Sequence, residues 1–262
     1  MHEHVYLNGS TVRHTEATIT SALLYGKGVF TTIAINDQKA FLWKKHWRRL
    51  VTNSEKLGID LSGHTEEKTR NALNELIAAN RIAMGRARIT FLDETPSPMW
   101  SSGTERKTSL LITTADFRPL PENFTLTVSS HRVNTTSPLA GVKSCNYLEH
   151  LTAFDEAKER GFQEAIRINE RGEIASACMA NVFWTKDGKL FTPSLKTGCL
   201  AGTTREYVLE NLECNEVEAR IEELEHSDQI FLTSAGIGII RVAGFQDGKL
   251  DSSDHPILTL LP

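Results

Sequence analysis

The segment Asn181–Arg205 reads NVFWTKDGKLFTPSLKTGCLAGTTR and combines a strand, a turn and the start of a helix. Its first residues, Asn181–Trp184, are mostly apolar and predict a strand, which the turn Lys186–Gly188 ends. The final residues, Leu200–Arg205 (LAGTTR), place a glycine and two threonines where a helix begins. Backbone N–H groups and hydroxyls at such a position favour an anion such as phosphate, whereas the simpler interpretation is that Thr203 only caps the helix.

Strands and helices are predicted on both sides of this segment, without a regular alternation of the two. Alternating or β-branched runs predict strands at Gly28–Ile35, Ala87–Leu92, Ser109–Thr114, Thr125–Ser129, Glu164–Ile168, Glu173–Ala177, Gln229–Leu232 and Ile237–Val242. Apolar residues at helical spacing predict helices at Lys44–Leu57, Thr65–Asn80, Asn146–Arg160 and Thr203–Asn211. The Asn8-Gly9 pair predicts a hairpin near the N-terminus. We therefore expect an α+β fold, and the lack of a GxGxxG sequence disfavours a dinucleotide-binding fold.

A proline-containing segment divides the chain into two parts. Asp116–Phe124 (DFRPLPENF) holds two of the eight prolines and predicts a linker. We expect a smaller N-terminal α+β domain over residues 1–117, a linker over 118–123 and a larger C-terminal α+β domain over 124–262. The length of 262 residues agrees with one large domain or two modest ones.

Composition and charge exclude several classes of protein. The chain has 29 Lys+Arg against 33 Asp+Glu and no long basic run, so nucleic acid is not an expected partner. No apolar run approaches the roughly 18 residues of a membrane span, so no membrane partner is expected. Four separate cysteines without a CxxC pair, and an N-terminus without an apolar leader, favour a reduced, cytoplasmic protein. The histidines show no HExxH spacing, so no catalytic metal is expected.

Three features of the second half point to chemistry. Lys143 lies in a loop before a helix, among small and apolar neighbours, where a lysine loses its charge more easily and its amine can form a Schiff base. The ordinary alternative is a solvated surface lysine. Thr233 and Ser234 follow a strand and form either a second phosphate clamp or a simple turn. Together with LAGTTR, these residues predict a phosphorylated aldehyde cofactor, of which pyridoxal phosphate is the common one.

Five motifs in a fixed order carry a resemblance to a known family. They are YGKGVFTTI at Tyr25–Ile33, HWRRL at His46–Leu50, the lysine at 143, NVFW at Asn181–Trp184 with LFTP at Leu190–Pro193, and LAGTTR at Leu200–Arg205. In their order and spacing the chain resembles the class IV aminotransferases over nearly its whole length. These fold-type IV pyridoxal-phosphate enzymes comprise branched-chain aminotransferases, D-amino acid aminotransferases and aminodeoxychorismate lyases. The resemblance implies a two-domain α+β fold and a homodimer with the active site near the domain boundary.

The resemblance also implies roles for individual residues. Lys143 is expected to form the Schiff base with pyridoxal phosphate and to move the proton during catalysis. Tyr147 lies close to the position of a tyrosine that contacts the ring hydroxyl, although the branched-chain enzymes have one more residue after the lysine. Leu200 is expected to pack on the pyridine ring. The groups implied to bind the phosphate are Arg49, Gly202, Thr203, Thr204, Thr233 and Ser234.

One residue of the family pattern is replaced in this chain. The family has a glutamate five residues before the asparagine of NVFW, and here that position is Ser176. The glutamate keeps the pyridine nitrogen protonated, which a neutral hydroxyl does not do. Glu173 lies three positions earlier, so on a strand its side chain points to the opposite face. We expect Ser176 to face the nitrogen, with two interpretations: a milder electron sink suited to elimination, or a catalytically weakened protein.

The lysine segment indicates which member of the family the chain resembles. VKSCNYL, with two residues between Lys143 and Asn146, resembles the lyases and the D-amino acid aminotransferases. We expect an aminodeoxychorismate-lyase-like enzyme that eliminates pyruvate and leaves an aromatic amine such as 4-aminobenzoate. The alternatives are an aminotransferase between an amino acid (branched-chain or D-) and a 2-oxo acid, and a cofactor-binding homologue with weak catalysis. Phe30-Thr31 replaces the family's Phe-Glu pair and is expected to alter substrate recognition. Candidates for binding a substrate carboxylate are Arg88, Arg132 and Arg241.

Overall fold

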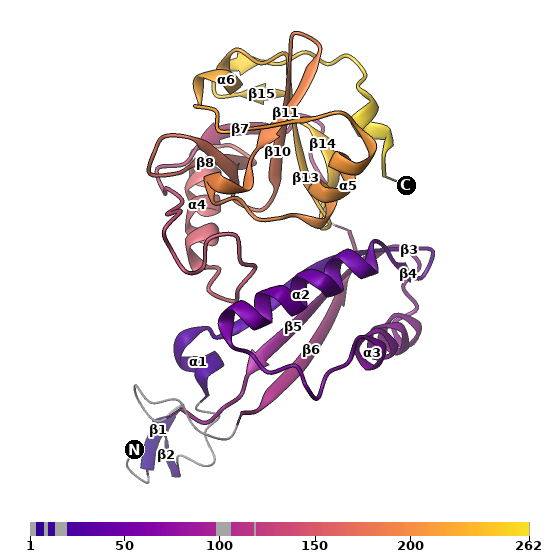
Figure 1. Cartoon of the computed structure of the whole chain (residues 1–262), viewed down its shortest axis with the longest axis vertical. Coiled ribbons are helices and arrows are strands. Elements are labelled where there is room, and N and C mark those ends of the chain that lie inside the picture. Colours follow the sequence, from indigo (N-terminus) through magenta and orange to yellow (C-terminus); the bar gives the residue numbers. More distant parts are fainter. Residues whose placement is uncertain (1–3, 8–9, 14–19, 98–105, 118, 262) are drawn as a thin grey trace.

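The first half of the chain folds around one four-stranded antiparallel sheet (Figure 1). The computed structural model describes residues 4–7, 10–13, 20–97, 106–117 and 119–261. The sheet has the order β4-β3-β5-β6 and consists of β3 (Gly28–Asn36), β4 (Lys39–Ala40), β5 (Gly85–Asp93) and β6 (Thr108–Ala115). Two helices, α2 (Trp43–Leu57) and α3 (Glu66–Ala79), pack against one of its faces.

The alternation of side chains along β3 and β5 gives this sheet two different faces. Val29, Ile33 and Ile89 are fully buried beneath the two helices. Phe30 and Arg88 point to the opposite face, because successive side chains of a strand alternate. This second face turns toward the other half of the chain and lines a large cavity.

Two five-stranded sheets form the second half. Their orders are β12-β11-β10-β13-β14 and β16-β15-β7-β8-β9. The strands are β7 (Thr125–Val128), β8 (Glu164–Ile168), β9 (Ile174–Ala177), β10 (Asn181–Lys186), β11 (Lys189–Pro193), β12 (Asn215–Val217), β13 (Gln229–Ser234), β14 (Gly238–Arg241), β15 (Gly244–Phe245) and β16 (Gly248–Lys249). Leu126 and Ile166 of one sheet share a core with Val182 and Ile230 of the other, so the sheets pack face to face.

Short elements complete the fold. The second half contains α4 (Leu148–Glu159), α5 (Thr203–Asn211), α6 (Glu222–Glu225) and the 3₁₀ turns η1 (Leu195–Thr197) and η2 (Pro256–Thr259). The first half begins with β1 (His4–Leu7), β2 (Ser10–Arg13) and α1 (Ser21–Tyr25). Within the described ranges, no helix is long and apolar enough to cross a membrane.

The mixed helix and sheet architecture confirms the predicted α+β class, and most predicted elements are found within two residues of their expected ends. The strands on either side of Asn8-Gly9 pair antiparallel as predicted, although residues 8–9 themselves lie outside the described residues. The helix predicted from Asn146 begins at Leu148. The sequence patterns do not predict β11, and they do not predict β12, α1 or α6, which are too short to show a period.

The connection between β6 and β7 joins two parts of the chain that have separate hydrophobic cores. One core contains residues from 29 to 91, and the others contain only residues from 124 onward. Figure 1 shows the same division as two lobes, with the α2 helix facing the second lobe. We propose that these lobes are the two domains expected from the sequence, with the boundary inside residues 118–123; residue 118 lies outside the described residues.

Candidate active site

The loop that carries Lys143 is bound to the edge of the first-lobe sheet. The N–H of Phe30 donates to the carbonyl oxygen of Lys143 at 3.0 Å, and the N–H of Cys145 donates to Gly28 at 2.8 Å. Val29 and Ser144 form an antiparallel bridge between these bonds. The neighbouring strand β4 pairs only with the last residues of β3, so this part of β3 is free to accept the loop. The backbone of Lys143 is therefore fixed by a strand more than 100 residues earlier in the chain.

The amine of Lys143 lies among aromatic rings and positive charges. Its Nζ is 3.3 Å from the hydroxyl of Tyr147 and 4.6 Å from the centre of the Phe30 ring. Burial, followed by the charges of Arg49 and Arg88, lowers the pKa of Lys143 to about 7. At neutral pH, Lys143 is therefore a free amine in a substantial fraction of the molecules, and this is the form that attacks an aldehyde.

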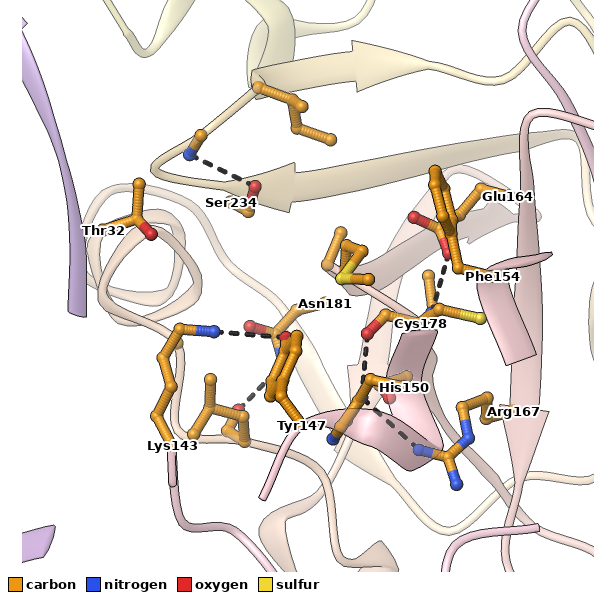
Figure 2. Close-up of a pocket in the computed structure, with 18 of the residues that line it drawn as sticks. Thr32, Lys143, Tyr147, His150, Phe154, Glu164, Arg167, Cys178, Asn181 and Ser234 are labelled. Carbon is orange, nitrogen blue, oxygen red and sulfur yellow. Dashed lines mark hydrogen bonds between the residues drawn. The ribbon is translucent and has the colours of Figure 1, made fainter. Parts of the chain in front are cut away.

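Tyr147, at the start of α4, is held from two sides, and Figure 2 shows His150 beside it. The Phe30 ring meets it edge-on at 5.2 Å, and the His150 ring stacks on it at 4.3 Å. The Nδ1–H of His150 donates to the carbonyl oxygen of Cys178 at 2.8 Å. Burial, followed by the nearby Arg167 charge, lowers the pKa of His150 to about 4, so the ring is neutral. Burial also raises the pKa of Tyr147 to about 12, so its hydroxyl keeps its proton.

Arg49 of α2 reaches across to the second lobe. Its Nη2 donates to Thr31 Oγ1 at 2.7 Å, and its Nη1 lies 3.4 Å from the carbonyl oxygen of Ala201. Its Nε is buried and has no hydrogen-bond partner among the residues that the structure describes. Burial lowers the pKa of Arg49 to about 10, so it keeps its charge at neutral pH. The guanidinium therefore has a donor available for an anion.

Asn181 and Gly202 shape the turn before α5. Asn181 Nδ2 donates to the carbonyl oxygen of Leu200 at 2.9 Å. A Cβ on Gly202 would lie 1.9 Å from Asn181 Oδ1, so only glycine fits beside this asparagine. The first intrahelical bond of α5 is made by Glu206, whose N–H donates to Gly202. The N–H groups of Thr203 and Thr204 precede it and have no intrahelical acceptor, which leaves them for an anion.

The turn between β13 and β14 faces the start of α5. Thr233 is paired with Asn181 in the sheet, and its hydroxyl is buried without a partner. Ser234 lies beside it, and its Oγ accepts from the N–H of Gly236 at 3.3 Å (Figure 2). Two turns from different parts of the sequence therefore face the same space.

One cavity of about 860 Å³ brings most of the predicted site residues together. Its size lies within the usual range for ligand pockets, roughly 300–1,000 Å³. The predicted residues that line it are Arg49, Arg88, Lys143, Tyr147, Ser176, Leu200, Gly202, Thr203, Thr204, Thr233 and Ser234. The cavity lies at the boundary of the two lobes.

Two of the three arginines predicted to bind substrate lie away from this cavity. Arg132 Nη1 donates to the carbonyl oxygen of Asn169 at 3.3 Å, and Arg241 Nη1 donates to that of Ser253 at 3.0 Å. Both side chains are thus occupied by loop carbonyls, and neither lines the cavity. Their positions therefore give no support to the expectation that these two residues bind a substrate carboxylate.

Arg88 alone of the three reaches the cavity. Its guanidinium lies 3.6 Å above the centre of the Phe30 ring, and its Nε donates to Thr90 Oγ1 at 3.3 Å. Arg86, two residues earlier on β5, also lines the cavity and was not among the candidates. Because both arginines share one face of the strand, the period of two along β5 is the signal that could have found Arg86.

Ser176 lies opposite an arginine instead of carrying a carboxylate. It is 8% exposed on β9, and its antiparallel partner on β8 is Arg167. Cross-strand partners share a face, so both line the cavity. Arg167 is buried, donates through Nε to the carbonyl oxygen of His131 at 3.1 Å and forms an ion pair with Glu149. The end of the cavity at Ser176 is therefore bordered by a positive group.

Glu173 does not replace the missing carboxylate. Its Oε2 accepts from Asn169 at 2.7 Å and from Arg171 at 2.7 Å, and it lies outside the cavity lining. This position agrees with the expectation that it points away from Ser176. The register shift between Arg167 and Ile168 does not bring it back to the same face.

The charges around the cavity match an anionic ligand. Two carboxylates line it among the described residues: Glu149 pairs with Arg167, and Glu164 accepts from the N–H of Cys178 at 2.9 Å. Burial raises the pKa of Glu164 to about 7, so its negative charge is partial at neutral pH.

No ion pair within the described residues joins Arg49, Arg88 or Lys143 to a carboxylate. The partnerless Arg49 Nε and Thr233 hydroxyl, the tight turn at Gly202 and the free amine of Lys143 fit both the phosphate and the aldehyde of pyridoxal phosphate.

The prediction from sequence missed several residues that shape this site. Thr31 points away from the cavity and binds Arg49 and His46. His46 stands inside the HWRRL motif, and His150 lies three residues after Tyr147 on the same helix face, so both had a local signal. Arg167 had none, because only the strand register brings it opposite Ser176.

Comparison with known proteins gives the family. The pattern of the family described as "Amino-transferase class IV" matches residues 28–245. A probable branched-chain-amino-acid aminotransferase of Rickettsia felis is 27% identical, over 97% of this chain and 91% of its own. An aminodeoxychorismate lyase of Bacillus subtilis is 29% identical, over 90% of this chain and 84% of its own. The crystal structure of a branched-chain aminotransferase from Thermoproteus uzoniensis with norvaline has a TM-score of 0.85 at 26% identity and covers 98% of this chain and 91% of that one. This chain is therefore a member of the class IV aminotransferase family.

Proposed function

We propose that this protein is a pyridoxal-phosphate-dependent lyase that eliminates pyruvate from an aminodeoxychorismate-like substrate and leaves an aromatic amine such as 4-aminobenzoate. Enzymes of the class IV family depend on pyridoxal phosphate, and the Bacillus subtilis relative is named an aminodeoxychorismate lyase. The observation that carries the choice of elimination is the Ser176 end of the cavity, where a hydroxyl and a buried guanidinium stand in place of a carboxylate.

Each end of the cofactor has residues suited to it. With pyridoxal phosphate bound, Leu200 would lie against the ring, Tyr147 near the ring hydroxyl, Ser176 near the ring nitrogen and Lys143 near the aldehyde. The groups that would hold the phosphate all line the cavity: Arg49, Gly202, Thr203, Thr204, Thr233 and Ser234. When bound, the cofactor supplies electron withdrawal from the carbon that bears the substrate amine.

Lys143 acts as both base and acid. Its amine would take the proton from the carbon that bears the substrate amine; in the protein without ligand, burial and Arg49 lower the pKa of this amine to about 7. The electron pair released at that carbon expels the enolpyruvyl oxygen, and the ring becomes aromatic. The ammonium of Lys143 would then give the proton to the methylene carbon of the departing enolate, which leaves as pyruvate. The proton removed and the proton added are equal in number, so the step needs no oxidant or second substrate.

Arg88 and Phe30 bind the substrate from the first lobe. A guanidinium stacked on an aromatic ring keeps its donors free at the edge, where a substrate carboxylate can accept them. Tyr147 and Phe30 place aromatic surface beside Lys143, which suits a six-membered ring.

The Ser176 end favours elimination over amino-group exchange. Without a carboxylate to hold a proton on the ring nitrogen, the cofactor is a weaker electron sink. Elimination tolerates this weakness, because the leaving group removes the electron pair within the same sequence of steps. Transamination is the second candidate, since the Rickettsia felis relative is named an aminotransferase and is similar over a larger share of the chain.

Product analysis separates these reactions. The loaded enzyme is mixed with aminodeoxychorismate, and 4-aminobenzoate and pyruvate are measured; parallel mixtures with single amino acids are followed by absorbance for conversion of the cofactor to its amine form. Equal amounts of aromatic amine and pyruvate support the lyase. Conversion with amino acids, without pyruvate from aminodeoxychorismate, supports the aminotransferase and overturns the proposal. A protein that binds the cofactor and performs neither reaction is the weakened homologue.

We also propose a homodimer in the cytoplasm. Large apolar side chains are exposed on α1 and at the start of α4, and Asn146 Nδ2 joins these segments by donating to the carbonyl oxygen of Gly26 at 3.0 Å. All four cysteines are free thiols, as a reducing compartment maintains them.

A further inference from the structure

A chain of buried hydrogen bonds joins the two sides of the phosphate end. Arg49 Nη2 lies 2.7 Å from Thr31 Oγ1, which in turn lies 2.7 Å from Nδ1 of His46. The other ring nitrogen of His46, Nε2, lies 3.2 Å from Thr203 Oγ1. Thr31, His46 and Thr203 are each at most 3% exposed. Arg49, Thr31 and His46 of this hydrogen-bond chain lie in the first lobe. Thr203, at its other end, is the first residue of α5 in the second lobe.

The donors and acceptors of this chain have one consistent order. A guanidinium only donates, so Thr31 Oγ1 accepts from Arg49 and has its own hydrogen to give to Nδ1 of His46. A neutral His46 then carries its hydrogen on Nε2 and donates to Thr203. The hydroxyl hydrogen of Thr203 stays free for a ligand. If His46 carried its hydrogen on Nδ1 instead, Thr31 Oγ1 would face two donors, Arg49 and His46. The buried hydroxyl hydrogen of Thr31 would then have no acceptor, which costs free energy.

The surroundings of His46 keep its ring neutral. Burial, followed by the positive charges of Arg49 and Lys143, holds the pKa of His46 well below its ordinary value. Both ring nitrogens contact hydroxyl groups. A protonated ring would donate from both nitrogens and would reverse the bond to Thr31.

We infer that His46 is a positioning residue for the cofactor phosphate, which aims the Thr203 hydroxyl and, through Thr31, the Arg49 guanidinium at one point. His46 lies behind the cavity wall, so its effect passes through the groups at the two ends of the chain. The inference rests on the assignment of the phosphate end in the proposed function. It is independent of whether the reaction is elimination or transamination.

Ion pairs on the same two helices fix the gap that this chain spans. Lys45 Nζ lies 2.9 Å from Glu206 and 2.5 Å from Glu210, and Arg48 also pairs with Glu206. Lys45 and Arg48 flank His46 on α2, and both glutamates lie on α5. These ion pairs hold α2 and α5 together beside the contact between His46 and Thr203.

The test compares two ligands that differ only in the phosphate. Dissociation constants of the apoenzyme for pyridoxal phosphate and for pyridoxal are measured for the wild type, His46→Leu and His46→Gln. We expect His46→Leu to weaken pyridoxal phosphate by about tenfold or more, the usual effect of losing a hydrogen bond to a charged group, and to leave pyridoxal nearly unchanged. The amide of His46→Gln can reach Thr203 and is expected to restore part of the loss.

A double-mutant cycle identifies the path. In a Thr203→Val background, His46→Leu is expected to have much less further effect on pyridoxal phosphate, because the hydroxyl that it orients is gone. If His46→Leu weakens both ligands equally, or weakens neither, the inference is wrong. If thermal melting shows that His46→Leu does not fold, His46→Gln decides the same comparison. This variant lacks the acceptor for the Thr31 hydroxyl, so we expect a smaller loss of affinity that is confined to pyridoxal phosphate.

Two further variants separate this inference from the site assignment. Arg49→Leu and Thr203→Val should each weaken pyridoxal phosphate relative to pyridoxal; if they do not, the phosphate end itself is misassigned. If they do and His46 variants do not, only the role of His46 fails. His64→Leu is the matched control, since His64 is a first-lobe histidine that contacts the carbonyl oxygen of Thr108 at 3.0 Å and the Phe91 ring, away from the cavity lining.

Discussion

At the scale of single residues, the charge on Lys143 controls when the site can react. Its pKa of about 7 lies far below that of a free lysine, with burial as the largest cause and the Arg49 and Arg88 charges next. The free amine is the reactive form, so the rate at which the apoenzyme captures pyridoxal should rise with pH around 7 and level off above it. Arg88→Met removes one of the two charges and should move this midpoint to higher pH. Stopped-flow absorbance across a pH series measures both.

Lys158→Met serves as a control for that experiment. Lys158 also lines the cavity, but its amine lies over the Phe154 ring, and it is not among the charges that act on Lys143. Its removal should leave the midpoint in place. A wild-type midpoint near 10, the ordinary value for lysine, would contradict the prediction.

In the proposed function, Ser176 and Arg167 set how strongly the ring nitrogen of the cofactor is polarised. Ser176→Glu alone places a carboxylate opposite a buried guanidinium, which should bind it and leave the nitrogen little changed. In Ser176→Glu with Arg167→Leu, the new carboxylate has no guanidinium partner and can raise the pKa of the ring nitrogen. We expect amino acids to convert the cofactor about tenfold faster or more, the effect of raising that pKa by one unit or more. Absorbance after rapid mixing measures the rate. Ser176→Gln with Arg167→Leu is the uncharged control, and equal rates in all these variants would show that the account of a weakened sink is wrong.

At the scale of elements, the turn before α5 depends on one glycine. Gly202→Ala would drive a methyl group into Asn181, whose side chain holds the carbonyl of Leu200. Relief of that clash must move the turn, so we expect a loss of about 1–3 kcal/mol in the free energy of unfolding and a weaker hold on pyridoxal phosphate. Chemical denaturation and a cofactor titration measure the two effects. Gly63→Ala has open space around its Cβ and should change neither; wild-type values for Gly202→Ala would refute the role of the turn.

Local signals predict some elements and not others. The helix predicted over Thr65–Asn80 from its apolar spacing is found as α3 (Glu66–Ala79), and Thr65 caps it by accepting from the N–H of Lys68 at 3.3 Å. β12 is short, polar and exposed, and it exists only because it pairs in parallel with β11. Nothing within its own three residues indicates a strand.

The candidate site shows the same limit. Lys143 and the turn at Gly202 were predicted because the residues next to them in the sequence indicate their chemistry. The pairing of Arg167 with Ser176 arises from strand register, and the reach of Arg132 and Arg241 depends on which loop carbonyls they meet. Relations between distant segments are fixed by tertiary packing and leave no local pattern.

At the scale of the whole molecule, an exposed apolar patch predicts how two copies meet. Leu23 and Leu148 are 68% and 74% exposed, and their segments are joined through Asn146 and Gly26. A patch of this kind on a folded chain commonly marks an interface. Leu148→Asp should therefore shift the protein from dimer to monomer at micromolar concentration, as measured by analytical ultracentrifugation.

Met84→Asp is the matched control for this prediction. Met84 is 51% exposed and directly precedes the first residue of β5. The other end of β5 is the one that lies near α1. Its replacement should leave the dimer intact. A monomeric wild type, or an unaffected Leu148→Asp, would contradict the proposed interface.

The pairing of the Lys143 loop with β3 has a consequence for solubility. The stretch of β3 before its contact with β4 is a row of backbone donors and acceptors at the margin of a sheet, and such margins invite other chains to add strands and aggregate. Residues 143–145 occupy that margin through two hydrogen bonds and a bridge. The segment that presents the reactive amine thereby also shields the sheet from intermolecular β-pairing, so a change that loosens this loop endangers solubility as well as catalysis.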